Sequence, residues 1–265
     1  MIDHAHGAYA RRALEVPALR CSDARRLVAE ASALLLDWDG CVAMGNRLVP
    51  SAVRLIAANP DRVAIVSNNS THLPADMAAL LKRHGIVLPE SRIVMAGTET
   101  VQWALGQKCA NVLMYASARL RGHALEHGLE LVRDAAMADT VILMRDVRFS
   151  YGRLQRATQA LQNGAQLVVS NADRVHPGAG GILMPETGAL LAAIRACVPD
   201  ADPIIIGKPG PSLFRRACTA LGVDPQNAVM IGDNPDTDIQ GAMGLGIAPI
   251  LVGPASPVQM DDLVE

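Results

Sequence analysis

The sequence predicts an α/β protein built on a doubly wound parallel sheet, with a second α/β unit inserted between its two halves. Two observations lead to this prediction. Short apolar runs alternate with segments of helical length along most of the 265 residues. Several of these runs end in carboxylates, hydroxyls or amides, as strands do when an open parallel sheet builds a ligand site at its carboxyl edge. The chain is long enough to bury a substantial core.

The composition argues against several classes of function. The formal net charge is −2, and the chain has two Trp, three Tyr and two Phe, so nucleic acid is not an expected partner. No apolar run approaches the length that spans a membrane, so no membrane partner is expected. The five cysteines are widely spaced and form no CxxC pair, which predicts a reducing, cytoplasmic location rather than a disulfide framework or a zinc site.

The first part of the chain predicts three strands of the main sheet. Residues 1–21 are interpreted as an N-terminal extension. Ser22 can cap the first helix, and Pro74 suits the first turn of a later one. In chain order we expect a helix at 22–32, a strand at 34–36, a helix at 51–58, a strand at 62–66, a helix at 74–85, a strand at 93–95 and a helix at 98–105.

A cap domain is predicted at 107–200, and residues 22–106 and 201–265 are predicted to form the core domain. The glycine-rich segment 176–181 is expected to be a loop without a dinucleotide site, since no strand–helix fingerprint surrounds it. In the cap we expect strands at 112–115, 140–144 and 167–169, with helices up to about 128, at 151–162 and at 187–196. The core then resumes with strands at 204–206, 228–231 and 248–252, and with helices at 211–221 and up to 244.

Two carboxylates follow the strand Leu34–Leu36 directly. Asp37 and Asp39 are two residues apart, so in an extended chain both side chains point to the same side. Two like charges that close are unfavourable unless a cation lies between them or one carboxyl holds a proton. Taken alone, this pattern also fits a solvated turn after a core strand.

Three further predicted strand ends carry polar residues that suit the same site. Ser67 and Asn68 follow the second strand, Lys208 follows the run 204–206, and Asp233 and Asp238 follow the run 228–231. In a parallel sheet these ends converge at one edge. Carboxylates favour a hard cation, and Mg²⁺ is the one that we expect, while a lysine, a hydroxyl and backbone N–H groups suit phosphoryl oxygens.

These motifs resemble those of the haloacid-dehalogenase-like superfamily, and within it the class IIA (NagD-like) phosphatases. The four matching segments are LLLDWDGCV at 34–42, VAIVSNNST at 63–71, GKP at 207–209 and IGDNPDTDI at 231–239. The resemblance covers roughly residues 25–255. It implies the superfamily's Rossmann-like core with an inserted cap, and a Mg²⁺-dependent phosphatase that acts on small phosphomonoesters.

The resemblance also implies roles for the acidic residues. Asp37 would be the nucleophile that forms an aspartyl phosphate, and Asp39 would protonate the leaving alcohol and then activate water. Mg²⁺ would be held by Asp37, the backbone carbonyl of Asp39, and Asp233, with Asp238 in or near the second shell of the metal.

The remaining implied roles concern the phosphoryl group and the rest of the substrate. Ser67 and Asn68 would hold phosphoryl oxygens, and Lys208 would offset the crowded negative charge. Asn171 and Asp173, at the end of a cap strand, are the predicted specificity residues. A small phosphorylated metabolite is the expected partner, and a homodimer through the cap is a further expectation. Met144-Arg145 and Pro185-Glu186-Thr187 replace glycine-containing patterns of the family's cap.

Other functions are weighed against a phosphatase. A phospho-acceptor receiver domain is a small continuous unit and fits poorly, because a long insert separates Ser67 from Lys208. A non-catalytic binding protein on the same fold would be expected to lack one of the three carboxylates at 37, 39 and 233. A dehalogenase needs no second aspartate at 39, whereas a phosphomutase or a phosphonate hydrolase stays open. Sugar phosphates, glycerol phosphate, nucleotides and pyridoxal phosphate all remain candidate substrates.

Overall fold

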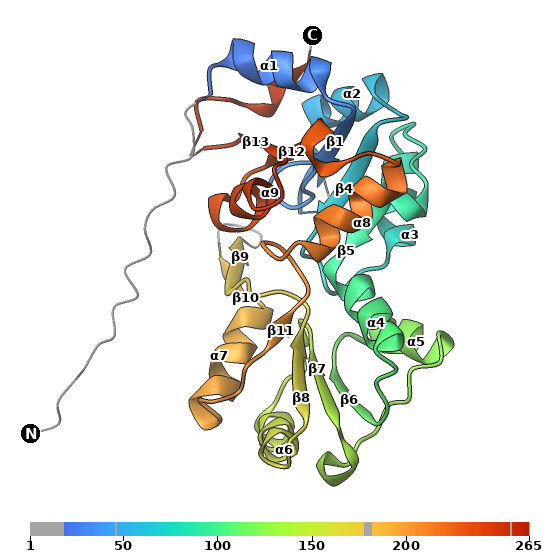
Figure 1. Ribbon diagram of the computed structural model, residues 1–265, viewed down its shortest axis with the longest axis vertical. Helices are drawn as coiled ribbons and strands as arrows, with labels where there is room; N and C mark the ends of the chain where they lie inside the picture. The colour runs from blue at the N-terminus through green and yellow to red at the C-terminus, as the bar shows by residue number, and fades with distance from the viewer. Residues whose placement is uncertain (1–18, 46, 178–181, 255, 265) are drawn as a thin grey trace, which may run out of the picture.

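The computed structural model describes residues 19–264 apart from 46, 178–181 and 255, and contains two parallel sheets stacked end to end (Figure 1). The five-stranded sheet has the order β13-β12-β1-β4-β5, and the four-stranded sheet has the order β11-β8-β7-β6. The first comprises β1 (Ala33–Leu36), β4 (Val63–Ser67), β5 (Ile93–Met95), β12 (Ala228–Gly232) and β13 (Ala248–Leu251). The second comprises β6 (Val112–Tyr115), β7 (Thr140–Leu143), β8 (Gln166–Val169) and β11 (Ile204–Ile205).

The helices lie on both faces of each sheet, which confirms the predicted fold class. The α-helices are α1 (Cys21–Glu30), α2 (Pro50–Ala58), α3 (Pro74–Lys82), α4 (Ala96–Gly106), α5 (Ala118–Glu126), α6 (Tyr151–Gln162), α7 (Thr187–Cys197), α8 (Ser212–Leu221) and α9 (Gln240–Met243). Shorter helical turns are η1 (Glu90–Arg92), η2 (Ala135–Met137), η4 (Pro225–Asn227), the π-helical η5 (Pro235–Ile239) and η6 (Met260–Leu263). No helix in the described part of the chain has both the length and the apolar character needed to cross a membrane.

Strand β1 occupies the centre of the five-stranded sheet and alternates between two apolar layers. It pairs in parallel with β12 on one side and with β4 on the other. Leu34 and Leu36 pack with α1, α2 and α3, whereas Leu35 packs with α8 on the opposite face. All three leucines are fully buried. This period of two fixes the direction in which the chain leaves the sheet at its carboxyl end.

The apolar layer behind Leu35 continues into the four-stranded sheet. Met114, Ile142 and Val168 of that sheet belong to the same buried cluster as Leu35 and Phe214. The opposite face of the four-stranded sheet packs against α6 and α7 in a separate cluster. The described part of the segment 107–200 therefore shares one of its two apolar layers with the five-stranded sheet.

The prediction that residues 204–206 return to the main sheet was wrong. Strand β11 pairs instead with β8, with Ile204 opposite Val168, and the Ile206 N–H extends the pairing by donating to the Val169 carbonyl at 3.0 Å. A run of three isoleucines shows that a strand is buried but not which sheet it joins, and here the nearest open edge belongs to the four-stranded sheet. Lys208 therefore follows a strand of the four-stranded sheet rather than one of the five-stranded sheet.

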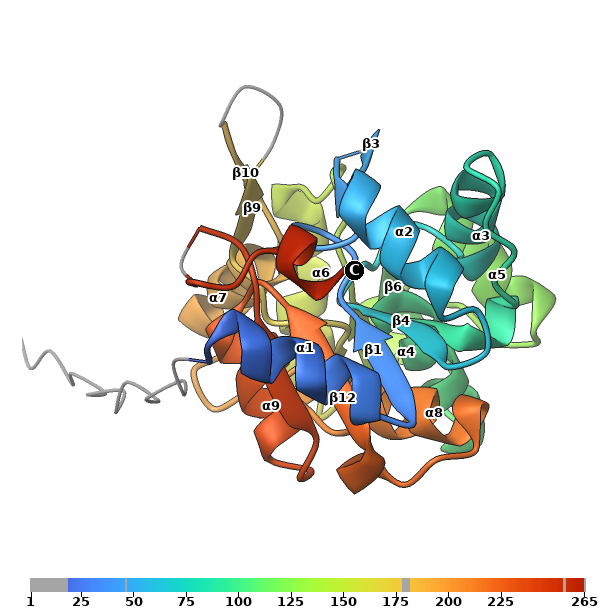
Figure 2. The same ribbon diagram turned by 90° about the horizontal axis from the view of Figure 1, so that it is seen from above.

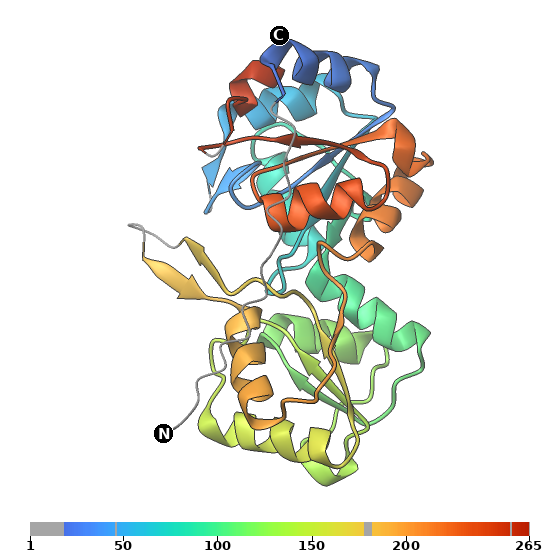
Figure 3. The ribbon, with the colours of Figure 1, turned by 60° about the vertical axis from the view of Figure 1, so that its left-hand side comes forward.

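Two antiparallel hairpins lie on the same side of the molecule in Figures 2 and 3. One is formed by β2 (Ala43–Met44) and β3 (Arg47–Leu48), directly after Asp39. The other is formed by β9 (Val175–Pro177) and β10 (Leu183–Pro185), and projects from the junction of the two sheets in Figure 3. The second hairpin includes part of the segment predicted as a loop, and residues 178–181 of that prediction lie outside the described residues.

Candidate active site

Asp37 lies at the carboxyl end of β1 and is almost completely buried. Its backbone N–H donates to the Ile231 carbonyl of β12 at 2.9 Å, so the central strands fix its position. Its Oδ1 accepts a hydrogen bond from Lys208 Nζ at 2.6 Å. Burial raises the pKa of the Asp37 carboxyl well above its ordinary value, although the Lys208 ammonium acts in the opposite direction. The lysine therefore favours the ionised form of a carboxylate that water reaches poorly.

Lys208 is the buried cation of this site and has all three of its N–H donors engaged. Nζ donates to Asp37 and Asp238 at 2.6 Å each, and to the Val66 carbonyl of β4 at 2.9 Å. Burial alone would lower the pKa of Lys208, but Asp238 and Asp37 together raise it above its ordinary value. The side chain is therefore charged, with its ammonium fixed between two carboxylates.

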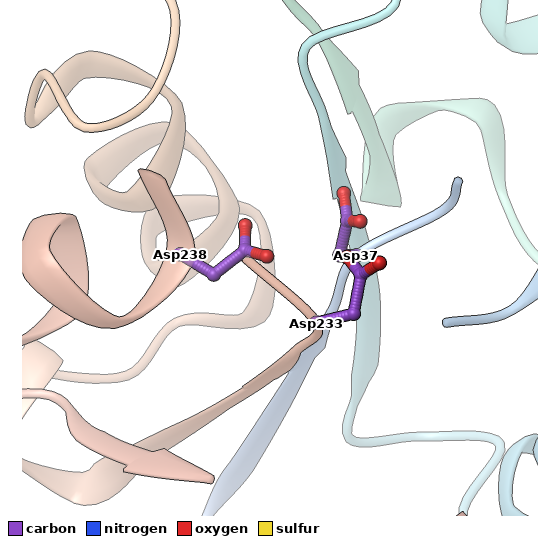
Figure 4. A group of neighbouring side chains, drawn as sticks. All are labelled: Asp37, Asp233 and Asp238. Atoms are coloured by element: carbon purple, nitrogen blue, oxygen red, sulfur yellow. The ribbon is translucent and has the colours of Figure 1, made fainter. Parts of the chain in front are cut away.

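Figure 4 shows three neighbouring carboxylates, those of Asp37, Asp233 and Asp238. Asp37 and Asp238 also accept hydrogen bonds from the Lys208 ammonium. One carboxylate oxygen from each of the three lies within 4.8 Å of the others. Burial, together with the charge of Asp238, raises the pKa of Asp233 to about 6. Three carboxylates facing one ammonium leave an excess of negative charge when they are ionised, and their oxygen donors are those that Mg²⁺ prefers. The residues therefore fit a divalent cation.

Gly40 makes room for this cluster. Its φ of +88° is in the left-handed region, and a Cβ at this position would lie 2.1 Å from Asp233 Oδ2. Any other residue would displace the Asp233 carboxylate. Both carboxylate oxygens of Asp238 are held by hydrogen bonds: Oδ1 accepts from Lys208 Nζ, and Oδ2 accepts from the Asn234 N–H at 3.1 Å.

Asp39 is not one of the three carboxylates whose oxygens lie within 4.8 Å of one another, but its charge is near enough to raise the pKa of Asp233. It follows Asp37 by two residues, bridges to Ala43 at the start of β2 and is exposed at the surface. Protein around the carboxyl still removes enough water to raise its pKa, while His176, Lys208 and His72 act to lower it. An exposed carboxyl beside a buried one is suited to exchanging protons with a leaving group and with water.

The polar residues after β4 contact the segment that carries Lys208. Ser67 is buried, and its Oγ accepts from the Asn69 N–H at 3.1 Å. The side chain of Asn68 accepts from the Lys208 N–H at 2.7 Å and donates to the Lys208 carbonyl at 3.1 Å. A Cβ on Gly207 would lie 2.5 Å from Asn68 Oδ1, so glycine is needed for this approach. The predicted contacts of Ser67 and Asn68 with phosphoryl oxygens remain predictions.

Residues 68–71 run across the carboxyl ends of three strands of the second sheet. Asn68 Nδ2 donates at 2.9 Å to Asp173, which follows β8. Ser70 Oγ accepts at 3.2 Å from the Arg145 N–H after β7, and the Thr71 carbonyl accepts at 3.2 Å from Ser117 Oγ after β6. We call residues 68–71 the junction loop. It joins the two sheets through hydrogen bonds at consecutive strand ends.

The predicted specificity residues Asn171 and Asp173 lie at this junction. Asn171 is buried, its Oδ1 accepts from Ser170 Oγ at 2.7 Å, and its Nδ2 donates to Asp173 Oδ2 at 2.9 Å. Asp173 Oδ2 also accepts the bond from Asn68. These contacts hold Asn68, and through it the backbone of Lys208. Direct contact of either residue with the substrate stays a prediction.

Sequence reasoning missed a group of three charged or titratable residues at the junction of the two sheets, Arg145, His176 and Glu186. Glu186 Oε1 lies 3.2 Å from Arg145 Nε and 2.7 Å from His176 Nδ1. Burial raises the pKa of Glu186, while Arg145 and His176 act to lower it. The sequence showed that Arg145 and Glu186 depart from a family pattern. It gave no sign that the end of β7, the hairpin β9–β10 and the start of α7 would meet.

Comparisons with known proteins identify the family of this chain. The family model of the haloacid dehalogenase-like hydrolases matches residues 31–246. The chain is 30% identical over 221 residues to a dihydroxyacetone phosphatase from Corynebacterium glutamicum, covering 82% of this chain and 79% of that one. It is also 30% identical over 224 residues to an acid sugar phosphatase from Staphylococcus saprophyticus, covering 83% and 85% of the two chains.

Solved structures show the same architecture. A glycerol phosphate phosphatase from Mycobacterium tuberculosis in complex with magnesium superposes with a TM-score of 0.76 at 29% identity, covering 85% of this chain and 69% of that one. A thermostable NPPase double mutant from Geobacillus stearothermophilus superposes with a TM-score of 0.74 at 29% identity, covering 84% and 89% of the two chains.

Proposed function

Because this chain belongs to the haloacid dehalogenase-like hydrolases, we propose that it is a Mg²⁺-dependent phosphatase that hydrolyses small phosphomonoesters through an aspartyl phosphate on Asp37. The observation that carries the proposal is the buried Asp37 at the end of β1, bonded to Lys208 and surrounded by Asp233 and Asp238. The family resemblance seen in the four motifs is confirmed. The named relatives act on small phosphorylated compounds, which supports a substrate of that size.

The first chemical step would form a bond between Asp37 and phosphorus. Lys208 holds Oδ1 of Asp37, so the second carboxylate oxygen can attack the phosphoryl group. The bond from phosphorus to the alcohol oxygen breaks as Asp39 donates its proton to that oxygen. A phosphoryl group on Asp37 and a free alcohol result. The raised pKa of Asp39 suits it to carry this proton.

The second step would return the enzyme to its initial state. Asp39, now ionised, accepts a proton from water as the water oxygen attacks phosphorus, and the bond to Asp37 breaks to release phosphate. Asp37, Asp233 and the backbone carbonyl of Asp39 would hold Mg²⁺, with Asp238 orienting Lys208. When bound, the ion would neutralise negative charge on the carboxylates and on the phosphoryl oxygens.

Chelation of the metal should abolish turnover. We expect phosphate release from a panel of metabolite phosphates to stop in excess EDTA, to return with Mg²⁺ and not to return with Ca²⁺. Calcium accepts more ligands in looser geometry and would favour a bidentate, poorly nucleophilic Asp37. The most active member of the panel would also narrow the substrate class. Undiminished turnover in excess chelator would contradict the metal assignment.

Stabilisation of the folded protein by Mg²⁺ should weaken in acid. A pKa of about 6 for Asp233 means that protons compete with Mg²⁺ below that pH. We expect Mg²⁺ to raise the Tm when it is added at a concentration near its dissociation constant at pH 7.5. At the same Mg²⁺ concentration, this rise in Tm should shrink as the pH falls through 6. The raised pKa means that the metal-free folded protein binds this proton more tightly than the unfolded chain. Protonation of Asp233 therefore does not itself destabilise the fold over this range.

Asp39→Asn should reduce kcat by about 10²–10⁴-fold for an alkyl phosphate, the range typical of a positioned acid–base group. The loss should be smaller for p-nitrophenyl phosphate, because its leaving group needs little protonation. Asp202→Asn is a matched control at an exposed aspartate, and should leave both rates unchanged. Equal losses with both substrates would argue against Asp39 as the acid.

A phosphonate hydrolase is the alternative that the structure makes least attractive, since that chemistry needs an amine for a Schiff base. The chain has three lysines, Lys82, Lys108 and Lys208. Lys82 and Lys108 are exposed outside the site, and Lys208 is charged and bonded to two carboxylates. We also propose a reducing, cytoplasmic location, because all five cysteines are free thiols. The division into core and cap domains and the homodimer through the cap stay predictions.

A further inference from the structure

A cleft of about 400 Å³ lies at the junction of the two sheets, lined by residues 71–72, 117–118 and 145–148. The junction loop connects this cleft to the active site. Thr71 of that loop lines the cleft, and Asn68 of the same loop binds the backbone N–H and carbonyl of Lys208 at 2.7 and 3.1 Å. The backbone N–H of Arg145, which also lines the cleft, donates to Ser70 of the loop at 3.2 Å. The cleft therefore lies beside the strand ends that carry the active site, where the leaving alcohol would be.

The charge balance of this cleft is positive. Arg145 approaches Glu186 through Nε, and a guanidinium has five N–H donors, so donors remain for a ligand. Arg148 forms no ion pair with any residue in the described part of the chain. Asp146 is the only carboxylate that lines the cleft, and it is buried and paired with Arg153. No free carboxylate thus offsets the two arginines within the described lining.

The acidic groups around the cleft are also engaged. Glu186 is shared between Arg145 and His176, and Asp173 accepts hydrogen bonds from Asn68 and Asn171. The N-terminal end of α5, at Ser117 and Ala118, is the positive end of the helix dipole and attracts an anion. Arginine binds planar carboxylates and phosphates through paired N–H donors, which makes this lining suitable for an anion.

We propose that this cleft binds an acidic group on the alcohol part of the substrate. The natural substrates are then phosphomonoesters that carry a second anion, either a carboxylate or a second phosphate. This inference rests on the proposed phosphatase function and identifies the substrate class of the same site. The volume of the cleft is sufficient for a small organic acid.

The test compares substrates that differ only in the second anion. 3-Phosphoglycerate carries a carboxylate where glycerol 3-phosphate carries a CH₂OH group. We expect kcat/KM of the unmodified enzyme to favour the acidic substrate by about tenfold or more, as for a charge-assisted hydrogen bond. Arg145→Gln and Arg148→Gln should each lower this ratio about tenfold. Arg26→Gln, at an exposed arginine on α1, should leave the ratio unchanged.

A second pair of substrates distinguishes the two sources of the anion. 1,3-Propanediol bisphosphate and 3-hydroxypropyl phosphate differ by one phosphate group. A larger preference in this pair would identify a second phosphate as the ligand, and a larger preference in the first pair would identify a carboxylate. Either result supports the proposal.

Three results would count against the proposal, each for a different reason. If the unmodified enzyme hydrolyses acidic and neutral members of both pairs equally well, the anion site is wrong and the phosphatase function stands. If it hydrolyses no phosphomonoester with Mg²⁺ present, the proposed function itself fails. Equal losses for both members of a pair in the arginine variants would show a structural role only. Arg148 is exposed, so Arg148→Gln keeps the test available should Arg145→Gln destabilise the fold.

Discussion

Asp37→Asn should lower turnover by at least about 10⁴-fold while the protein still folds. The substitution keeps the shape of the side chain and removes the carboxylate that we propose as the nucleophile, which Lys208 holds at 2.6 Å. Steady-state phosphate release with Mg²⁺ measures the loss, and the free energy of unfolding in urea shows whether the fold survives. Lys208 keeps Asp238 as its partner in this variant, and burial disfavours the charged form of Asp37, so a neutral amide at this position should cost less stability than removal of the lysine.

The matched control is Asp61→Asn, at an exposed aspartate in the connection between α2 and β4. It makes the same chemical change far from Lys208 and should leave turnover within twofold of the unmodified protein. Trapping the phosphorylated enzyme with labelled substrate gives a second readout. The label should be lost in Asp37→Asn and retained in Asp61→Asn. Label that persists at full yield in Asp37→Asn would show that another residue is the nucleophile.

Lys208→Met should both inactivate the enzyme and destabilise the fold by about 3–5 kcal/mol near neutral pH in chelator, the cost of breaking a buried ion pair. The methionine fills a similar volume but leaves the Asp37 and Asp238 carboxylates without their common cation. Urea unfolding measures the change. Lys82→Met, at an exposed lysine on α3, is the control and should change stability by less than about 0.5 kcal/mol.

The pH dependence of this loss follows from the direction of the pKa shift. The pKa of Lys208 is raised in the folded protein, so its stabilisation is fully present below the pKa of a lysine in the unfolded chain and is lost as the pH rises through the folded value. At low pH, the difference in the free energy of unfolding between the unmodified protein and Lys208→Met should shrink, because protonation removes the charge of Asp37. A difference that stays constant from pH 4 to pH 9 would contradict a role based on charge.

The acidic part of the site could be anticipated from the sequence because its residues follow strands directly. The position of Asp37 depends only on the alternation of Leu34, Leu35 and Leu36 and on the order of the parallel strands. The helix at 151–162 was likewise predicted with its observed bounds, since helical periodicity is a local property. Local patterns therefore located both elements.

What could not be anticipated depends on contacts between distant segments. The pairing of β11 with β8 is decided by which sheet edge lies nearest, and three isoleucines suit either sheet equally. Glu186 meets Arg145 and His176 only because the hairpin β9–β10 folds back over the junction, and no short-range pattern encodes that meeting. The polar residues of the second sheet were for this reason predicted less well than the aspartates.

The junction loop and the shared apolar layer limit how such a protein can diversify by recombination. If residues 107–200 were exchanged between relatives as an independent module, the new segment would have to keep Asp173 for Asn68, Ser117 for Thr71, and the backbone N–H of residue 145 for Ser70. It would also have to preserve the fit of Met114 and Ile142 in the layer shared with Leu35. A new substrate preference should therefore evolve more readily by point substitutions in the residues that line the cleft than by exchange of the whole segment 107–200.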